Sequence, residues 1–117
     1  MELRSVEELM ELLYARRHQH ALRTAALLRR GRPADKELQV AGLVYGIGAA
    51  EAVRPLLGER VFRLVRGDAG PVDDDALRLR QAAEESRTAR FDAGVLEDWR
   101  TVLELVAARN SRLGAVD

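Results

Sequence analysis

The sequence predicts an all-α fold, a compact bundle of six or seven helices. Two observations support this prediction. Apolar residues recur at helical spacing along most of the chain, and strong helix starts and stops separate the segments. An apolar run over 38–47 fits a buried strand by periodicity alone, but its helical neighbours and the lack of other strand candidates favour a helix. At 117 residues the chain is expected to form one domain, 1–117, with a frayed tail over about 111–117.

The first half of the chain predicts three helices. Ser5 and Glu8 have capping-box spacing, and one face of the following helix carries Val6, Leu9, Met10, Leu13 and Tyr14. A polar segment over 16–20 predicts a bend, and the second helix ends at Gly31-Arg32-Pro33. Asp35 can cap a third helix, whose apolar run predicts the buried central helix of the bundle.

The second half predicts short helices followed by two longer ones. Residues 49–57 and 59–66 form short helices, the first bent by Pro55, with a break at Gly58. After a turn over 67–71, a helix begins at 73–75 and runs to about Arg90, with Leu77, Leu79 and Ala83 as its apolar positions. The last helix shows a core stripe at Leu96, Trp99, Leu103 and Val106 and is expected to fray after about Asn110.

Composition excludes several classes of function. Lys+Arg and Asp+Glu both number 19, so the formal net charge is zero, which argues against a nucleic-acid partner, and the basic patch at 29–32 has no interleaved aromatic residue. The lack of cysteine excludes disulfides, thiolate nucleophiles and zinc–cysteine sites. No apolar run is long enough to span a bilayer and no signal-peptide pattern is present, so we expect a cytoplasmic protein without a membrane partner.

Five segments, 20–27, 41–48, 54–65, 75–80 and 96–100, are spread over most of the chain and resemble, in order, parts of the HD-domain superfamily. Residues 41–48, Ala-Gly-Leu-Val-Tyr-Gly-Ile-Gly, are similar to its signature Ala-Ala-Leu-Leu-His-Asp-Ile-Gly. The segment beginning at His20 resembles the one that supplies the first metal-binding histidine. Residues 54–65, 75–80 and 96–100 resemble helices of the branch that contains HD-type oxygenases and phosphonate-cleaving enzymes. The resemblance implies an HD-like helical fold around one active-site cleft.

Most positions that hold metal in that family are replaced here. His20 is kept. The other ligand positions correspond to Tyr45, Gly46 and Ala49, to a residue near Gly67 or Asp68, and to Ala83 or Glu84. A lysine that often follows the last ligand in that family corresponds to Arg87. The stretch between Gly70 and Asp73 is also much shorter than in the oxygenase-like branch, where it helps to build the substrate pocket. Transition-metal sites need three or more converging side chains, so we expect no metal and no cofactor.

His20 and Tyr45 are the candidate catalytic residues. His20 is either a retained acid–base group or a relic histidine that is hydrogen-bonded within the bundle. Tyr45 is a phenol on the most buried helix: it either fills the volume of the lost metal, with its hydroxyl toward His20, or donates a proton or a hydrogen bond to a ligand. His18, two residues from His20, is expected to face elsewhere on a helix, at the surface.

Asp68, Arg80, Glu84 and Arg87 are the candidate ligand-binding residues. The last three lie at i, i+4 and i+7, so they share a helix face, where two arginines flanking a carboxylate can hold an anionic or polar ligand. The alternative is an ordinary ladder of surface ion pairs. Asp68 either points into the former cleft or is a simple turn residue.

Two functions follow from this reading. The first is an HD-fold protein that has lost the metal centre and binds a small molecule or a protein partner in or beside the former cleft. The second is a metal-independent enzyme, in which His20, Tyr45 and a carboxylate perform acid–base chemistry on a small organic substrate. A metal-dependent phosphohydrolase or oxygenase is the weakest reading. A large exposed apolar patch would favour a partner protein or a homo-oligomer.

Overall fold

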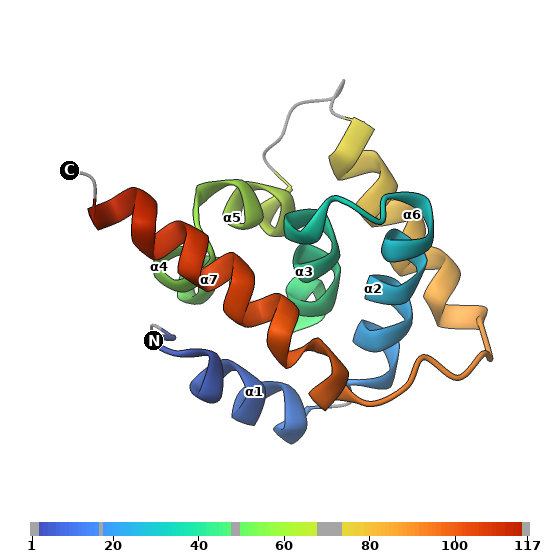
Figure 1. Ribbon diagram of the computed structural model, residues 1–117. Coiled ribbons are helices and arrows are strands. Elements are labelled where there is room, and N and C mark those ends of the chain that lie inside the picture. The colour runs from blue at the N-terminus through green and yellow to red at the C-terminus, as the bar shows by residue number, and fades with distance from the viewer. Residues whose placement is uncertain (1–2, 17, 48–49, 68–73, 116–117) are drawn as a thin grey trace.

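The computed structural model describes residues 3–16, 18–47, 50–67 and 74–115, which form an all-α fold (Figure 1). The α-helices are Val6–Ala15 (α1), Gln19–Gly31 (α2), Lys36–Val44 (α3), Ala50–Leu57 (α4), Glu59–Arg66 (α5), Asp74–Thr88 (α6) and Arg100–Ala115 (α7). Short 3₁₀ helices lie at Tyr45–Ile47 (η1) and Leu96–Trp99 (η2). The predicted all-α class and the predicted number of helices are confirmed.

Two predicted helix caps are present. The Ser5 hydroxyl accepts a hydrogen bond from the backbone N–H of Glu8 at 3.2 Å, and the Glu8 carboxylate accepts from the backbone of Arg4 at 2.8 Å. At the start of α3, the Asp35 carboxylate accepts from the backbone N–H of Leu38 at 3.1 Å. Such caps satisfy amide groups that have no partner inside the helix, and each typically stabilises it by about 1 kcal/mol.

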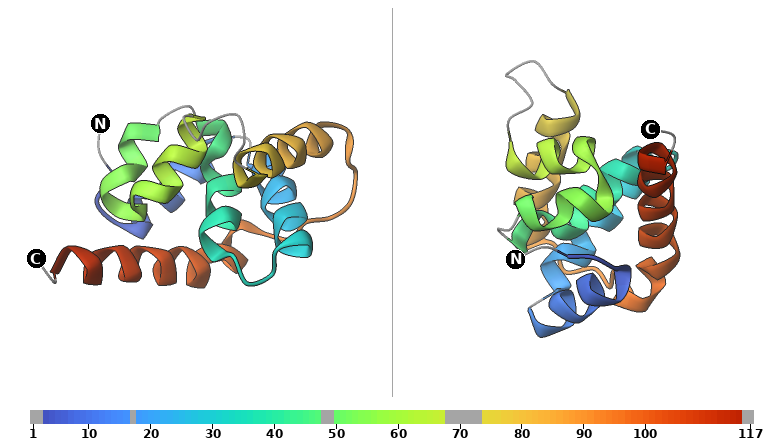
Figure 2. Two further views of the ribbon diagram at one scale, coloured as in Figure 1. Left: turned by 90° about the horizontal axis from the view of Figure 1, so that it is seen from above. Right: turned by 90° about the vertical axis from the view of Figure 1, so that its left-hand side faces the viewer.

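Helix α3 is the centre of the bundle, as predicted. Figures 1 and 2 show it between α2 and α6 on one side and α4 and α5 on the other, with α7 in a layer of its own. Every residue from 38 to 44 is buried. At Gly42 an added Cβ would lie 2.6 Å from Leu28 Cδ1 and 3.5 Å from Ala25 Cα. The lack of a side chain at Gly42 therefore allows α2 to approach α3 closely.

The last helix is longer than the sequence predicts. Its expected core stripe is buried: Leu96, Trp99, Leu103 and Val106. The stripe begins in η2, and α7 then continues to Ala115 instead of ending near Asn110. Asn110 explains part of the difference, because its side-chain amide donates to the carbonyl of Pro55 at 2.9 Å and joins α7 to α4.

Two residues expected on apolar helix faces lie at the surface. Tyr14 is 53% exposed and its ring meets the imidazole of His18 edge-on, with 5.7 Å between centroids. Leu77 is 46% exposed, while the buried positions of α6 are Leu79, Ala82, Ala83 and Ser86. Both residues were expected in the core because they are apolar. In the structure they lie at the edge of the apolar stripe of their helix and remain exposed.

Candidate functional site

A depression of about 490 Å³ lies between η1 and α6 and brings together most of the predicted site residues. It is lined by Tyr45, Leu77, Arg80, Gln81, Ala83, Glu84 and Arg87. Helix α6 packs on the bundle through Leu79, Ala82 and Ser86. The positions at 77, 80, 84 and 87 recur at helical spacing, so they form one stripe beside the buried face. The shared face predicted for Arg80, Glu84 and Arg87 is therefore present, with Tyr45 opposite.

The charges of this depression are weakly paired. Arg87 Nη1 lies 3.9 Å from Glu84 Oε1, and the two side chains are 69% and 72% exposed. A pair this open is worth less than about 1 kcal/mol and is easily exchanged for another partner. Arg80 makes no hydrogen bond or ion pair with the residues that the structure describes. The depression thus presents two guanidinium groups that are available to an anion.

Tyr45 does not meet His20 as the sequence suggested. The tyrosine is half-buried and lines the depression beside α6, whereas His20 lines a separate, smaller cavity. No hydrogen bond joins the two side chains in the described part of the chain; His20 is bonded to Ser86 instead. A hydrogen bond between the tyrosine hydroxyl and His20, as the predicted repair suggested, is therefore not present among the described residues. Tyr45 directly follows α3 and keeps helical dihedral angles, with φ −56° and ψ −42°.

His20 belongs to a cluster with two buried hydroxyl groups. Its Nδ1 lies 2.7 Å from Ser86 Oγ, which also lies within hydrogen-bond distance of the Ala83 carbonyl at 2.8 Å. The Thr24 hydroxyl lies 2.9 Å from Ser86 Oγ and 3.0 Å from the carbonyl of His20. Both hydroxyls are almost fully buried. The expected histidine bonded within the bundle is thus present, and its partner is Ser86; we name Thr24, Ser86 and His20 the hydroxyl cluster.

Burial and nearby arginines favour the neutral form of His20. Burial lowers the pKa of the imidazole below its ordinary value of 6.5, and the positive charges of Arg87 and Arg23 lower it further. The hydrogen bond with Ser86 acts in the opposite direction. Since Nδ1 faces a hydroxyl, a neutral imidazole can accept from Ser86, and a charged one can donate to it. Ser86 is itself fully buried, so it is not a nucleophile that a substrate can reach.

His18 shares the cavity of His20, which the sequence did not predict. The cavity has a volume of about 90 Å³ and is lined by Leu13, Arg16, His18, His20, Ala21, Leu43 and Gly46. His18 precedes α2 as its N-cap residue, so helical spacing does not apply to the pair. Among the described residues, no group of three or more His, Asp or Glu side chains is placed to hold a metal ion. Asp68 lies outside the described residues.

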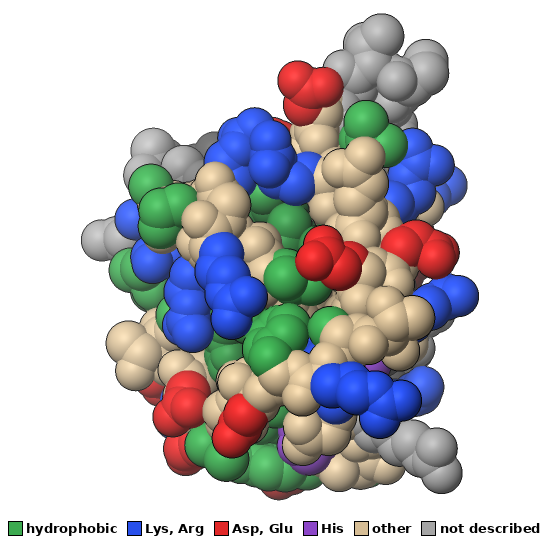
Figure 3. Space-filling model, turned by 90° about the vertical axis from the view of Figure 1, so that its right-hand side faces the viewer, with side chains coloured by type: hydrophobic (Ala, Val, Ile, Leu, Met, Phe, Trp, Pro, Cys, Tyr) green, Lys and Arg blue, Asp and Glu red, His purple; other side chains and the backbone are tan. Residues whose placement is uncertain are grey.

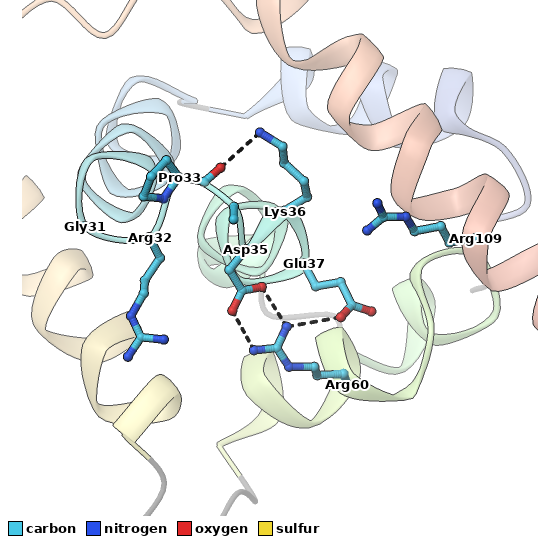
Figure 4. Close-up of a pocket in the computed structure, with 9 residues that line it drawn as sticks. Gly31, Arg32, Pro33, Asp35, Lys36, Glu37, Arg60 and Arg109 are labelled. Atoms are coloured by element: carbon cyan, nitrogen blue, oxygen red, sulfur yellow. Dashed lines mark hydrogen bonds and ion pairs between the residues drawn. The ribbon is translucent and has the colours of Figure 1, made fainter.

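A network of charged side chains at the opposite end of α2 was not predicted (Figure 4). The Arg60 guanidinium donates from Nη1 and Nη2 to the Asp35 carboxylate at 2.7 and 2.8 Å, to Glu37 at 3.1 Å and to Asp75 at 3.0 Å. Arg32 pairs with Asp75 at 3.3 Å. These contacts raise the pKa of Arg60, and the Arg60 hydrogen bond lowers that of Asp35. We name this group the Arg60 cluster.

The basic patch over 29–32 is engaged within the fold. The guanidinium carbon of Arg29 lies 4.7 Å from the centroid of the Trp99 ring, and that of Arg30 lies 4.6 Å from the Phe91 ring. Arg32 pairs with Asp75. On the face that carries α2 and α6, basic and acidic side chains are interspersed with apolar ones (Figure 3). Across the described ranges, no helix is both long and apolar enough to cross a membrane.

No family model, curated protein or solved structure matches the chain. The resemblance to the HD-domain superfamily therefore stays a prediction.

Proposed function

We propose that this chain is an HD-like helical protein without a metal centre, and that it binds a small organic anion in the depression between Tyr45 and α6. One observation carries the proposal: Arg80 lines a depression of about 490 Å³ without a partner among the described residues, one helical turn from Glu84 and two from Arg87. Arginine recognises carboxylate and phosphate groups through paired N–H donors. A ligand anion would give Arg80 the partner that the described residues do not provide.

The other lining residues favour a ligand that is partly apolar. Leu77 is nearly half exposed at one end, Ala83 is small and buried, and the Tyr45 ring forms the opposite wall. Gln81 adds an amide that can donate and accept hydrogen bonds. Binding sites for small molecules combine apolar walls with a few polar groups that fix orientation. We therefore propose an aromatic or branched carboxylate as the ligand class.

Benzoate is a suitable probe, with benzamide as its neutral counterpart. Amide signals of Tyr45, Gln81 and Ala83 are followed by NMR during titration at constant ionic strength. We expect benzoate to shift them saturably, and Arg80→Gln to weaken binding by about fivefold to tenfold, the effect of losing one hydrogen bond worth about 1 kcal/mol at an exposed site. Arg78→Gln is the matched control, since it removes an exposed arginine of α6 that does not line the depression. Equal shifts with benzoate and benzamide, or none, would overturn the proposal.

Metal analysis tests the proposed lack of a metal centre. The purified protein is expected to carry iron or manganese well below one ion per chain, because the positions that hold metal in the HD family are mostly replaced here. Near-stoichiometric metal that is lost in His20→Ala would show that a metal centre persists. The metal-independent enzyme that pairs His20 with Tyr45 is less supported, because the two side chains line different cavities.

A further inference from the structure

A second cavity, of about 480 Å³, lies between the α2–α3 turn, α5 and α7 (Figure 4). Six of the residues that line it carry ionisable side chains: Arg32, Asp35, Lys36, Glu37, Arg60 and Arg109. It is separate from the depression beside Tyr45, with which it shares no lining residue. Its walls come from the continuous stretch 31–37, from Arg60 on α5 and from Arg109 on α7, so it exists only in the folded chain.

The two carboxylates of the cavity are already neutralised. Arg60 donates to both oxygens of Asp35 and to Glu37. Asp35 also accepts from the backbone at the start of α3. A carboxylate with these partners repels an incoming anion much less than a free one, since the nearby guanidinium offsets its charge.

Two cations of the same cavity lack an acidic partner. Arg109 makes no ion pair or hydrogen bond with the described residues, and Figure 4 shows its guanidinium extending from α7 toward the α3 side. Lys36 Nζ donates at 3.1 Å to the carbonyl of Pro33, a neutral acceptor. Four cationic side chains and two carboxylates line the cavity, which leaves a formal excess of two positive charges. Asp75, bonded to Arg32 and Arg60 beside the cavity, reduces the excess to one.

The wall between these cations is held in place before any ligand arrives. Gln39 is fully buried, and its Nε2 donates to the carbonyls of Arg32 and Pro33 at 2.8 and 3.2 Å. These bonds fix the turn that precedes Lys36, while Arg60 fixes the first turn of α3 against α5. Preformed sites bind with less loss of conformational entropy than mobile ones.

We infer that this cavity is a second binding site, which takes a small molecule through a phosphate or carboxylate group held between Lys36 and Arg109. The lysine exchanges its neutral carbonyl acceptor for the anion, and the arginine gains the partner that it lacks. The cavity is larger than a single oxyanion needs, so the rest of the ligand lies along the other residues that line it.

Titration with inorganic phosphate and, separately, acetate at constant ionic strength tests the inference. We expect phosphate to shift the backbone amides of residues 35–37 and the side-chain Nε–H of Arg109 saturably in NMR spectra. Arg109→Gln and Lys36→Gln should each weaken phosphate binding by about fivefold to tenfold. Acetate should bind less tightly than phosphate, because it carries one charge instead of two near pH 7.5.

Arg63→Gln is the matched control, since Arg63 lies on α5 outside the cavity and its removal changes the net charge by the same amount. It should alter the phosphate affinity by less than about twofold. Equal weakening by Arg63→Gln and Arg109→Gln would overturn the inference, because general electrostatic attraction then explains the binding. Phosphate shifts at residues 35–37 that do not saturate, or that persist unchanged in both cavity variants, would overturn it as well. The benzoate experiment reports on different amides, so the two proposals fail independently.

Discussion

Helices α2 and α6 run antiparallel (Figure 1). Hydrogen bonds between buried hydroxyls join them at one end of the pair, and ion pairs join them at the other. Near the start of α2, the hydroxyl cluster of Thr24, Ser86 and His20 is joined by hydrogen bonds, and its hydroxyls are almost fully buried. Near the end of α2, the Arg60 cluster joins Arg32 to Asp75 through charged groups that are partly open to solvent. The same two helices are therefore joined by hydrogen bonds between hydroxyls where water is excluded, and by ion pairs where the side chains are exposed to water.

This difference follows from the free energy of transfer out of water. A hydroxyl can be buried at modest cost once it is hydrogen-bonded, while a buried ion pair loses several kcal/mol of hydration per ion. At the solvated end of the pair the loss of hydration is small, and the Arg60 guanidinium can form hydrogen bonds with three carboxylates at once. The contrast predicts that the two ends differ in how much they stabilise the fold and in how they respond to salt and pH.

The largest effect is expected for Arg60→Met, which removes the centre of the Arg60 cluster. Asp35, Glu37 and Asp75 then lose a shared partner and repel one another, so we expect a loss of about 2 kcal/mol in the free energy of unfolding at low salt. Urea denaturation at low and high salt measures it, and the loss should shrink as salt increases. Arg63→Met is the control, because Arg63 is 65% exposed and, within the described ranges, forms an ion pair with Glu59 alone. A loss that salt does not change would contradict an electrostatic origin.

The next effect is expected for Ser86→Ala at the buried end. It leaves His20 Nδ1 without its hydroxyl partner and removes one acceptor of Thr24, at a cost of about 1–2 kcal/mol. Because the Thr24–Ser86 pair is neutral and buried, we expect the loss to be the same at low and high salt. Urea denaturation of Ser111→Ala, which alters an exposed serine of α7, gives the baseline. If the loss of stability in Ser86→Ala depended strongly on salt, the proposed difference between the two ends of the α2–α6 pair would be wrong.

A smaller effect is expected for Thr24→Val, which keeps the shape of the side chain and removes its hydroxyl. Ser86 retains both His20 and the Ala83 carbonyl as partners, so the loss should be about 0.5–1 kcal/mol. Combined with Ser86→Ala in a double-mutant cycle, the two losses should sum to more than the double variant shows. Strict additivity would mean that the bond between these hydroxyls contributes nothing measurable.

The smallest effect is a pH dependence centred on His20. Burial and two neighbouring arginines lower its pKa in the folded state below the ordinary value of 6.5, so the unfolded chain binds the proton more readily. The stabilisation is therefore fully present above pH 6.5 and is lost as the pH falls from there through the lower folded-state pKa. Thermal unfolding across this range should show the loss in the natural protein and in His18→Gln, but not in His20→Gln. An equal loss in His20→Gln would assign the pH dependence to other groups.

The helices were predictable from sequence because their signals are local. Ser5, Asp35 and Gly58 mark helix boundaries through caps and a positive φ, which depend on a few neighbouring residues. The identity of α3 as the central helix followed from its lack of polar residues. The extent of α7 was missed in part because of a tertiary contact, the bond from Asn110 to Pro55.

The candidate site was only partly predictable. Helical spacing alone places Arg80, Glu84 and Arg87 on one face of the helix. By contrast, Tyr45 and His20 line different cavities, which depends on how the helices pack and not on a local sequence pattern. Thr24 lies one turn after His20 on an apolar face, a position at which a buried hydroxyl needs a hydrogen-bond partner. Its partner Ser86 is 62 positions away, so only the folded structure connects them.

Helix α4 is where the two terminal segments of the described chain are secured. The backbone N–H of Leu3 donates to the Ala52 carbonyl at 2.9 Å, and Asn110 donates to Pro55 one turn further on. Both contacts close loops of roughly fifty residues, which are slow to form, whereas the α2–α3 pair is local. Amide hydrogen exchange should therefore be slowest in α2 and α3 and faster in α1, α4 and the end of α7, so that the molecule opens from its periphery while its centre stays folded.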